Sequence, residues 1–543
     1  MFTFLSLMYL YNTYCFNATT NLPLQVLQQE DFEPPTRTLM LKCIRKPKWE
    51  EAEQAELKSI QDCNVWTKDP QPPDGVKPLP LKWVYKVKKD LQGFFQVFGF
   101  DYTETYSPVA KFTSIRLLLA IAVQLGLYIH QMDVDTAFLN APIDEHIWVK
   151  VPDGTNLPPG DNGVYKLLKS LYGLKQAPRC WNNMLNQYLI DEKFERLEAD
   201  PCLYVKVLTI NENGIVKTQF MIVAIYVDDL IIAASTKNLI TNIEAIFEKK
   251  FKMKKLNRIK HLLGMGILHD KQTNTIFISQ EQYISTMVDK ISKYRLSEYS
   301  TSMDAKKIYS KLQCPKVDTP EALKMRTLPY RELIGTLLWI SNGTRPDITY
   351  SVTTLARFSS NPAFEHWQAA LRVLGYLNHT KHHCIKYTQQ LNYSTIVSRG
   401  YSRGYLPSFS DYKFYVDASF ATDPDSRRSV TGYIFFISGG PVSWQSRLQT
   451  SVALSSMEAE YMATTAATQE ALWQTRLLQQ LGMRVTLPVV LFEDNKSAIL
   501  FSDHPGDHRT TKHIITRKEF TRDHVKKGDI KLEFVATQDQ LAD

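Results

Sequence analysis

One apolar stretch with two adjacent carboxylates constrains this chain more than any other feature. The segment "FMIVAIYVDDLIIAAS" (Phe220–Ser235) is rich in β-branched residues and carries Asp228 and Asp229 at its centre. Ionised carboxylates are costly to remove from water, and adjacent like charges raise that cost unless a cation or hydrogen-bond donors answer them. The pattern predicts two strands joined by a turn, with the acids at the tip, either in a wet turn or at a metal site.

A third acid ends another predicted strand. The segment "SIRLLLAIAVQLGLYIHQMDVDTAFL" predicts a long apolar helix that ends near Gly126 and a strand that reaches Asp133. If this strand neighbours the hairpin, three carboxylates meet at one end of a sheet and can hold two Mg²⁺ ions, which stabilise the attacking and leaving oxygens of a phosphoryl transfer. The alternative is that the Asp-Asp pair only forms a hairpin turn.

Composition narrows the class of protein. A chain of 543 residues with 44% hydrophobic content fits two or three globular domains. The net charge of +8 is modest, but lysines cluster in "KWVYKVKKD", "FEKKFKMKKLNRIK" and "DHVKKGDIK", which fit a phosphate backbone and a solvated face equally well. The seven cysteines lack the spacing of a disulfide framework or a zinc site, which indicates a reducing compartment.

The first 20 residues, "MFTFLSLMYLYNTYCFNATT", are apolar and aromatic. They lack a basic flank, and their apolar core is too short to span a bilayer. We expect a tail of unknown role, with a signal peptide as the lesser alternative. We therefore expect an intracellular protein, cytoplasmic or nuclear, that is not secreted and has no membrane partner.

A second set of acids lies in the C-terminal part of the chain. Its members end predicted strands in "KFYVDASF" and "VVLFEDNKSA", open a helix in "SSMEAEYMA", and close the chain in "QLAD": Asp417, Asp494, Glu458 and Asp543. Such acids can bind two metal ions that activate water for phosphodiester hydrolysis. Glu460 is a near rival of Glu458. Alternatively, Ser455 and Glu458 have the spacing of a capping box, and Asp494 could cap the next helix.

Several motifs, in order, resemble one family. "DYTETYSPVAKFTSIR" from Asp101, "QMDVDTAFLNAPI" from Gln131, "LYGLKQAPRCWN" from Leu171 and "YVDD" at Tyr226 are similar to the reverse transcriptase of copia-type LTR retrotransposons. The likeness continues through "LPYRELIGTLLWISNGTRPDITYSV", and "YVDASFATDPDSRRSVTGY", "SSMEAEYMA" and "EDNKSAI" are similar to the ribonuclease H domain of that family's polyproteins. The resemblance covers nearly everything after Trp49.

The resemblance implies an α+β and α/β multidomain chain. It would contain a right-hand polymerase with fingers, palm and thumb, a helical connection, and an RNase H-like α/β domain. The expected divisions are a tail at 1–44, the reverse transcriptase at 45–310, the connection at 311–410 and the RNase H-like domain at 411–543. The implied activities are RNA-directed DNA polymerisation and hydrolysis of the RNA strand of a hybrid.

The resemblance also assigns roles to residues. Asp133 and Asp228 would be the principal metal ligands, Asp229 would assist, the carbonyl of Val134 would complete a shell, and Phe138 would lie against the sugar of the incoming nucleotide. Further residues match the nucleotide- and template-binding positions: Gly173, Lys175, Gln176, Pro178 and Tyr226. In the C-terminal part Asp417, Glu458, Asp494 and Asp543 match four catalytic acids, the first three as metal ligands.

The implied cofactor is Mg²⁺, two ions at each site, with Mn²⁺ as an alternative. The implied partners are an RNA template, a DNA primer, an RNA–DNA hybrid and deoxynucleoside triphosphates. Their recognition would rest on backbone contacts and the 2′-hydroxyl rather than on base sequence.

Two departures from the family pattern bear on activity. After Gly93 the chain runs into "FFQVFGFDYTET", without the basic stretch similar to "YKARLVAKGF" whose cations hold the triphosphate. Asp135 stands where the family commonly has lysine, which reverses a charge beside Asp133. A catalytically dead remnant that still binds nucleic acid is therefore the alternative to an active enzyme.

Overall fold

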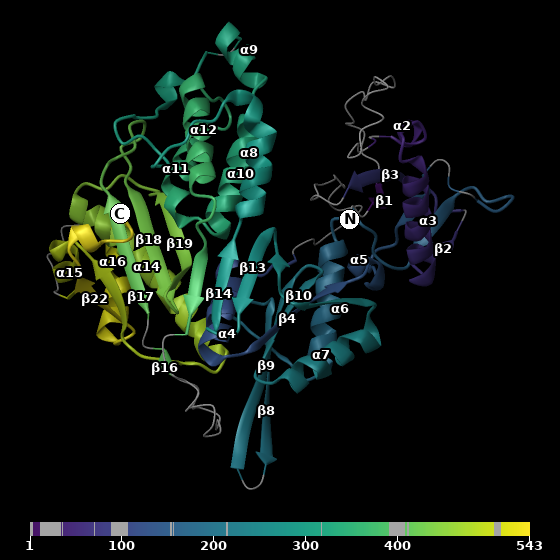
Figure 1. The fold of residues 1–543 in the computed structure, drawn as a ribbon, viewed down its shortest axis with the longest axis horizontal. Helices are drawn as coiled ribbons and strands as arrows, with labels where there is room; N and C mark the ends of the chain where they lie inside the picture. Colours follow the sequence, from purple (N-terminus) through teal and green to yellow (C-terminus); the bar gives the residue numbers. More distant parts are fainter. Residues whose placement is uncertain are drawn as a thin grey trace.

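A computed structural model describes most of the chain: residues 4–10, 34, 36–69, 71–87, 107–152, 155, 157–212, 215–316, 318–389, 408–409, 412–503 and 512–543. Figure 1 shows an N-terminal region at the right, a central sheet, a group of helices at the top and a C-terminal domain at the left. The mixed α+β fold expected from the sequence is present, since helices pack against several separate sheets.

The N-terminal region contains a five-stranded sheet in the order β1-β3-β5-β6-β2. Its elements are β1 (Phe4–Leu10), α2 (Arg37–Met40), α3 (Lys46–Asp62), β2 (Trp66–Lys68), β3 (Leu79–Val87), β5 (Trp148–Lys150) and β6 (Val164–Leu167). Part of the segment that the sequence suggests is a tail therefore pairs as β1, antiparallel to β3.

The central sheet has six strands in the order β11-β4-β10-β9-β8-β7. Its strands are β4 (Tyr128–Val134), β7 (Glu195–Arg196), β8 (Leu203–Glu212), β9 (Ile215–Tyr226), β10 (Asp229–Ala234) and β11 (Met253–Arg258). Its helices are α4 (Phe112–Leu125), α5 (Ala137–Asn140), α6 (Ala177–Asp191) and α7 (Lys237–Lys250). The predicted strand-turn-strand unit is β9 and β10, and the predicted strand to Asp133 is β4.

Both faces of the central sheet are buried, which explains why β10 is apolar without alternation. On one face Leu230 and Ile232 join a core with the residues of α6 and α7 that face the sheet. On the other face Ile231 and Ala233 join a core that includes α4 and extends into the C-terminal domain. Because both faces of strands β9 and β10 are packed, the turn between them has a fixed position.

Helix α4 joins the central sheet to the C-terminal domain. Its apolar pattern ends at Gly126, which caps the helix with a φ of 63°. The guanidinium of Arg116, buried in this helix, donates to the carbonyl oxygens of Asn342, Gly343 and Val442 at 2.6, 3.0 and 2.8 Å. These bonds satisfy a buried charge and connect three parts of the chain that are distant in sequence.

The helices at the top of Figure 1 stand on a four-stranded sheet in the order β12-β13-β14-β15. The strands are β12 (His261–Leu262), β13 (Met265–Asp270), β14 (Thr275–Ser279) and β15 (Ile385–Thr388). The helices are α8 (Glu281–Ile291), α9 (Pro320–Arg326), α10 (Tyr330–Gly343), α11 (Thr349–Ala356) and α12 (Phe364–His379), with short 3₁₀ turns η1 (Ser292–Tyr294), η2 (Lys311–Gln313) and η3 (Pro346–Ile348). They share one apolar core of their own.

The C-terminal domain has a five-stranded sheet in the order β19-β18-β17-β21-β22. Its elements are β17 (Lys413–Ser419), β18 (Val430–Ile437), β19 (Gly440–Leu448), α14 (Ser456–Gln480), β21 (Val489–Glu493), α15 (Lys496–Asp503), α16 (Lys512–Lys526), β22 (Ile530–Phe534) and η4 (Thr537–Asp539). A two-stranded piece pairs β16 (Ser408–Phe409) with β20 (Arg484–Val485). Strand β17 pairs antiparallel with β18 and parallel with β21.

Among the described residues, no helix has both the length and the apolar character needed to cross a bilayer.

Candidate active sites

The hairpin and its neighbour bring three acids to one edge of the central sheet. We call Asp133, Asp228 and Asp229 the central acids. Asp229 and Asp133 lie directly opposite each other on β10 and β4, and Asp228 lies in the turn before β10. The backbone N–H of Val134 donates to the carbonyl oxygen of Asp228 at 3.2 Å. The register therefore sets Asp133 opposite Asp229 at this edge, with Asp228 next to Asp229 in the turn.

The turn between β9 and β10 has a strained backbone, and a hydrogen bond from a tryptophan stabilises it. Val227 has a φ of 59°, a conformation that β-branched residues rarely adopt. The indole Nε1 of Trp181, on α6, donates to the carbonyl oxygen of Val227 at 2.6 Å. The Trp181 ring is buried on the face of α6 that packs against the sheet. Packing of α6 thus fixes the turn that carries Asp228.

Lysines in β11 and directly before it form ion pairs with acids at this edge. Lys254 is the cross-strand partner of Asp133, and its Nζ lies 3.7 Å from Asp133 Oδ2. Lys254 also pairs with Asp135, and the Nζ of Lys252 lies 3.7 Å from Asp135 Oδ2. Burial acts to lower the pKa of Lys254, but the bonds to Asp135 and Asp133 outweigh it and raise that pKa. The charge reversal at Asp135 therefore has a local partner, which sequence reasoning missed.

The residues expected to contact nucleotide and template surround this edge. Phe138 lies on α5, and its ring centroid is 4.9 Å from that of Tyr172. Tyr226 ends β9 and pairs with Asp229. Gln131 donates through Nε2 to Asp229 Oδ1 at 3.0 Å. Thr136, with a φ of 51°, turns the chain from Asp135 into α5.

The glycine-containing loop lies between β6 and α6. Gly173 has a φ of 94°, which a residue with a side chain would adopt only with strain. Gln176 is the N-cap of α6, and Pro178 is in its first turn. The Gln176 side chain is buried and donates to Glu145 at 3.4 Å, whereas Lys175 is partly exposed. The segment after Gly93, with its expected loss of triphosphate-binding cations, and the motif from Asp101 to Tyr106 lie outside the described residues.

A second cluster lies on the C-terminal sheet. Asp417, Glu460 and Asp494 each offer a carboxylate oxygen within 4.8 Å of the others, and within the described ranges no other trio of His, Cys, Asp or Glu meets this limit. We call them the C-terminal acids. Asp417 lies in β17, Glu460 in the second turn of α14, and Asp494 just after β21. Because β17 and β21 are neighbouring parallel strands, their acids meet at one sheet end.

The structure brings Glu460, rather than Glu458, to this cluster. Glu458 is in the first turn of α14, where its Oε2 accepts from the N–H of Leu454 at 2.8 Å. Its own N–H donates to the side-chain oxygen of Ser455 at 3.2 Å, so Ser455 caps α14, while the Glu458 carboxylate bonds Leu454 and not the N–H of Ser455 that a full capping box would use. Two residues along a helix is a rotation of about 200°, so the two glutamates face opposite sides.

The C-terminal acids repel one another in a buried setting. Burial, followed by the charges of Asp494 and Asp543, raises the pKa of Asp417 to about 6. Burial and the charges of Glu493 and Asp417 raise the pKa of Glu460 as well. The Oε2 atom of Glu460 is buried and has no hydrogen-bond partner among the described residues. This cluster therefore lacks the positive charge that its acids require.

Glu493 is a further acid that the sequence analysis did not select. It is fully buried at the end of β21, beside Asp494. Its Oε2 accepts from the hydroxyl of Thr464 on α14 at 3.0 Å, and its Oε1 accepts from the N–H of Asn495 at 3.1 Å. Burial raises the pKa of Glu493. The adjacent letters "ED" in "LFEDNK" were the available signal.

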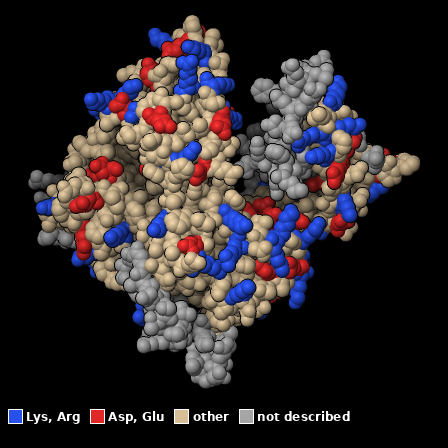
Figure 2. Space-filling model, in the orientation of Figure 1, with Lys and Arg blue, Asp and Glu red and all other residues tan. Residues whose placement is uncertain are grey.

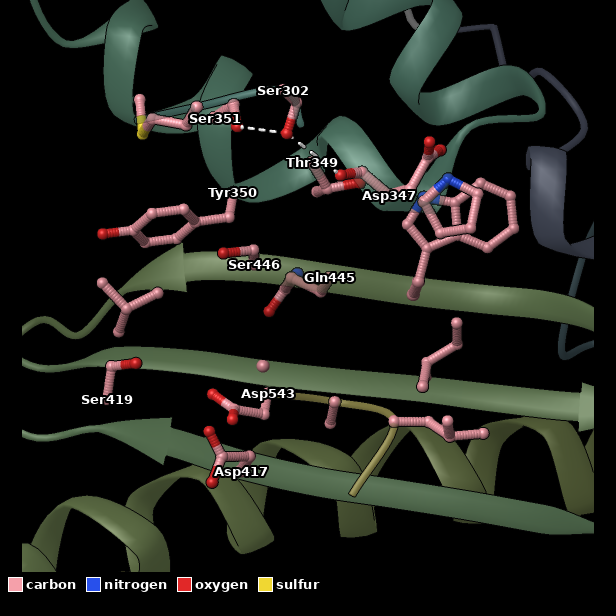
Figure 3. Close-up of a pocket in the computed structure, with 18 of the residues that line it drawn as sticks. Ser302, Asp347, Thr349, Tyr350, Ser351, Asp417, Ser419, Gln445, Ser446 and Asp543 are labelled. Atoms are coloured by element: carbon pink, nitrogen blue, oxygen red, sulfur yellow. Dashed lines mark hydrogen bonds between the residues drawn. The ribbon is translucent and has the colours of Figure 1, made fainter. Parts of the chain in front are cut away.

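The chain end lies beside Asp417. A Cβ at Gly432, on β18, would be 2.6 Å from the carbonyl oxygen of Ala542, so only glycine allows the terminal segment to approach. Gln540 donates through Nε2 to the carbonyl oxygen of Val416 at 2.9 Å. In Figure 3 the side chain of Asp543 lies next to that of Asp417.

A cleft of about 740 Å³ opens above these acids, and we call it the Asp417 cleft. Figure 3 shows its two walls, with Asp417, Asp543, Gln445 and Ser446 on the sheet side, and Tyr350 and its neighbours on the helical side. The hydroxyl groups of Ser302 and Ser351 are 2.9 Å apart in the helical wall. The cleft is lined by both polar and apolar side chains, and Asp417 and Asp543 lie in its sheet wall.

The donor sets suit Mg²⁺, which prefers carboxylate oxygens. The C-terminal acids fit best, because their oxygens already converge and one buried oxygen is unsatisfied. The central acids share an edge by register, with Lys254 beside one of them. Among the described residues neither cluster contains histidine or cysteine, which argues for a hard cation rather than zinc.

Comparisons with known proteins decide the family. A sequence model described as reverse transcriptase (RNA-dependent DNA polymerase) matches residues 63–303. A putative transposon Ty5-1 protein of Saccharomyces cerevisiae is 32% identical over 342 residues, which cover 62% of this chain and 100% of that protein. The chain belongs to the Pol polyproteins of copia-type LTR retrotransposons. The resemblance seen in the sequence is thereby confirmed.

Two longer relatives of this copia-type chain are Pol polyproteins. The Retrovirus-related Pol polyprotein from transposon TNT 1-94 of Nicotiana tabacum is 36% identical over 531 residues, 95% of this chain and 38% of that protein. The corresponding RE1 polyprotein of Arabidopsis thaliana is 31% identical, over 93% of this chain and 33% of its own length. The chain thus spans little more than a third of these relatives. A foamy viral protease-reverse transcriptase in complex with double-stranded DNA matches 98% of the chain at 12% identity, but its TM-score of 0.20 carries no argument.

Proposed function

We propose that this chain is an RNA-directed DNA polymerase joined to a ribonuclease H. The observation that carries the polymerase is the register that sets Asp133 opposite Asp229, with Asp228 in the intervening turn, inside a segment that matches the reverse transcriptase family. The partners would be an RNA template, a DNA primer, deoxynucleoside triphosphates and an RNA–DNA hybrid. The expected fingers, palm, thumb and connection, the RNase H-like domain and their boundaries are part of this proposal.

At the central edge the chain's residues would bind and orient the reactants. Asp133 and Asp228 would hold Mg²⁺, with Asp229 and the Val134 carbonyl assisting, and the bound ions would stabilise the charge on the attacking and leaving oxygens. Phe138 would exclude a 2′-hydroxyl by contact with the sugar. Other residues would position nucleotide and template: Gly173, Lys175, Gln176, Pro178 and Tyr226. Lys254, held by Asp135, would orient the carboxylate of Asp133.

At the C-terminal site Asp417, Glu460 and Asp494 would hold Mg²⁺, and Asp543 would approach from the chain end. Mn²⁺ would serve in the same sites, because it also accepts carboxylate ligands. The convergence of three carboxylates with one unsatisfied buried oxygen supports this proposal. Glu458 keeps its place in the proposal only as a cap of α14, since its carboxylate bonds the backbone of Leu454.

Primer extension tests the polymerase. The purified chain is given a DNA primer on an RNA template with Mg²⁺ and with EDTA, beside an Asp228→Asn variant. We expect extension in Mg²⁺ only, and a loss of roughly a thousandfold in the variant. Asp289→Asn, which changes an exposed acid on α8, is the matched control and should extend normally.

A variant of the chain with a "YKARLVAKGF"-like segment inserted after Gly93 distinguishes a disabled polymerase from a protein that only binds nucleic acid. Extension only with this segment would identify a polymerase disabled by the missing cations. No extension in either version, together with primer–template binding that Mg²⁺ and EDTA leave equal, would identify the binding-only remnant. Extension by Asp228→Asn would show that the metal assignment is wrong.

A further inference from the structure

A second cleft, of about 580 Å³, lies among the upper helices and takes no part in the two acid sites. We call it the upper cleft. It is bounded by α9, by the N-terminal half of α12 and by the segment 294–309. Asp304 and Lys307 also line the Asp417 cleft, so the segment 301–307 is a wall between the two clefts.

The lining of the upper cleft has an excess of positive charge. It includes Arg295, Lys307, Lys324 and Arg372, against one carboxylate, Asp304. In the part of the chain that the structure describes, none of these four cations forms an ion pair with a carboxylate. Asp304 is engaged by its own loop, since its Oδ1 accepts from the N–H of Lys306 at 3.0 Å. Figure 2 shows lysines and arginines near α9 at the top of the visible face.

Aromatic rings lie between these cations. The Phe364 ring, which begins α12, is 40% exposed, and the Nζ of Lys324 lies 5.5 Å from its centroid. The guanidinium of Arg372 lies 4.4 Å from the centroid of the Tyr299 ring. Trp367 and Tyr309 are buried and form the floor. Each accessible ring thus has a cation beside it.

The Arg372 side chain is held in place and is not fully satisfied. Its Nη2 donates to the hydroxyl of Thr301 at 2.8 Å. Its Nε is buried and has no hydrogen-bond partner among the described residues. A buried guanidinium N–H without a partner is uncommon and marks a place where an acceptor is expected. Because Nε itself is buried, a phosphate oxygen in the cleft would contact the terminal guanidinium nitrogens of Arg372.

We propose that the upper cleft binds single-stranded nucleic acid, with bases stacked on Phe364 and Tyr299 and phosphates on Arg372, Lys324 and Lys307. The exposed ring of Phe364 and the partly exposed ring of Tyr299 each lie beside a cation that has no carboxylate partner among the described residues. Such a pair fits a base and its phosphate, and base stacking tolerates any sequence. An acidic peptide would use the cations but not the rings. The two clefts share the wall 301–307, so a nucleic-acid strand that leaves the Asp417 cleft would continue into the upper cleft. This path for the strand rests on the proposed ribonuclease function.

The test measures binding without catalysis. Fluorescence anisotropy follows a labelled oligothymidylate of about eight nucleotides as it binds the full chain in EDTA. We expect Phe364→Leu to weaken binding about tenfold through lost stacking. Lys307→Gln with Lys324→Gln should weaken it by a similar factor and reduce its salt dependence. Lys237→Gln with Lys316→Gln, two exposed lysines outside the cleft and outside the three lysine clusters, is the matched control and should leave affinity unchanged.

Cross-linking locates the bound strand. An oligonucleotide with 5-iodouracil should attach on irradiation to peptides that contain Tyr299 or Phe364. Cross-links confined to other peptides, or equal affinity in the cleft variants and the control, would overturn the proposal. Weakened binding in the lysine pair but not in Phe364→Leu would indicate an acidic partner and would also overturn it. The assay is run in EDTA and involves no catalysis, so failure of this site is distinguishable from failure of either catalytic assignment.

Discussion

The two acid clusters both bring negatively charged carboxylates close together, but their surroundings differ. The central acids lie at a sheet edge where β11 supplies lysines, and Lys254 lies 3.7 Å from Asp133. The C-terminal acids lie in a buried setting with a fourth acid, Glu493, directly behind them. The pKa values of Asp417 and Glu460 are raised, to about 6 for Asp417, because burial and the charges of neighbouring acids disfavour the ionised forms.

This difference determines which positive charge each cluster has before a metal ion binds. The central edge already has a resident cation, because Lys254 pairs with Asp133 and Asp135 in the free chain. The C-terminal cluster must hold protons until a cation replaces them, so metal binding there is coupled to proton release. We therefore expect the two clusters to respond differently when a carboxylate is replaced, when the pH is raised or when a lysine is replaced.

The largest effect is expected from Glu460→Gln. Loss of one of three converging carboxylates should lower cleavage of the RNA strand in a hybrid by at least about a hundredfold. Primer extension should be unchanged, because the central acids are untouched. Gel analysis of a labelled hybrid and of an extended primer, on the same preparation, measures both. Cleavage at the original rate would remove Glu460 from the site, and a parallel loss of extension would indicate general misfolding.

The next effect is a pH dependence of stability in EDTA. The pKa of Asp417 is raised from about 4 to about 6, so the folded chain keeps a proton that the unfolded chain releases in this range. The corresponding stability is fully present below about pH 4 and is lost as the pH rises through about 6. The partly exposed carboxyl should account for about 1–2 kcal/mol of unfolding free energy.

Urea unfolding of the original chain and of Asp417→Asn, at several pH values, isolates this contribution. The difference in unfolding free energy between the two should grow between about pH 4 and pH 6 and then level off. Excess Mg²⁺ should reduce it, since the ion takes the place of the proton. A difference that does not vary with pH would mean that Asp417 has an ordinary carboxyl environment.

A smaller effect is expected from Lys254→Met. Without this cation Asp133 loses its ion pair with β11, so the Mg²⁺ concentration that half-saturates primer extension should fall by roughly threefold to tenfold. Lys255→Met is the control, because Lys255 pairs with Glu248 at 2.9 Å and makes no contact with Asp133. The Mg²⁺ requirement for RNA cleavage should not change. A higher requirement for extension would show that Lys254 assists metal binding instead of competing with it.

Much of this arrangement could be predicted from the chain. The hairpin at Asp228, the helix that ends at Gly126, the strand to Asp133 and the opening of α6 near Pro178 all follow from local patterns of apolar residues, glycine and proline. These signals act over a few residues, which is why sequence reasoning reaches them. The family resemblance then added the order of the motifs.

What could not be predicted depends on packing between distant segments. Lys254 meets Asp135 only because β11 pairs with β4, and no local pattern sets that register. Which of Glu458 and Glu460 faces Asp417 depends on where α14 begins and how it lies on β17. The upper cleft combines residues from α9, α12 and a loop, so its charge and its rings are adjacent only in the folded chain.

The smallest predicted effect sharpens the choice between the two glutamates. Glu458 lies in the first turn of α14, where a negative charge interacts favourably with the helix dipole, and its carboxylate accepts from the N–H of Leu454. Glu458→Gln keeps an acceptor but loses the charge, so the unfolding free energy should fall by about 0.5 kcal/mol. RNA cleavage measured beside that of Glu460→Gln should stay within about twofold of the original rate, since a change of this size alters helix stability but not the metal ligands. If Glu458→Gln lost as much cleavage as Glu460→Gln, the start of α14 would have to lie differently in the active chain, with Glu458 turned toward Asp417. The two variants differ only by two positions on one helix, so the ratio of their cleavage rates reports the orientation of that helix directly.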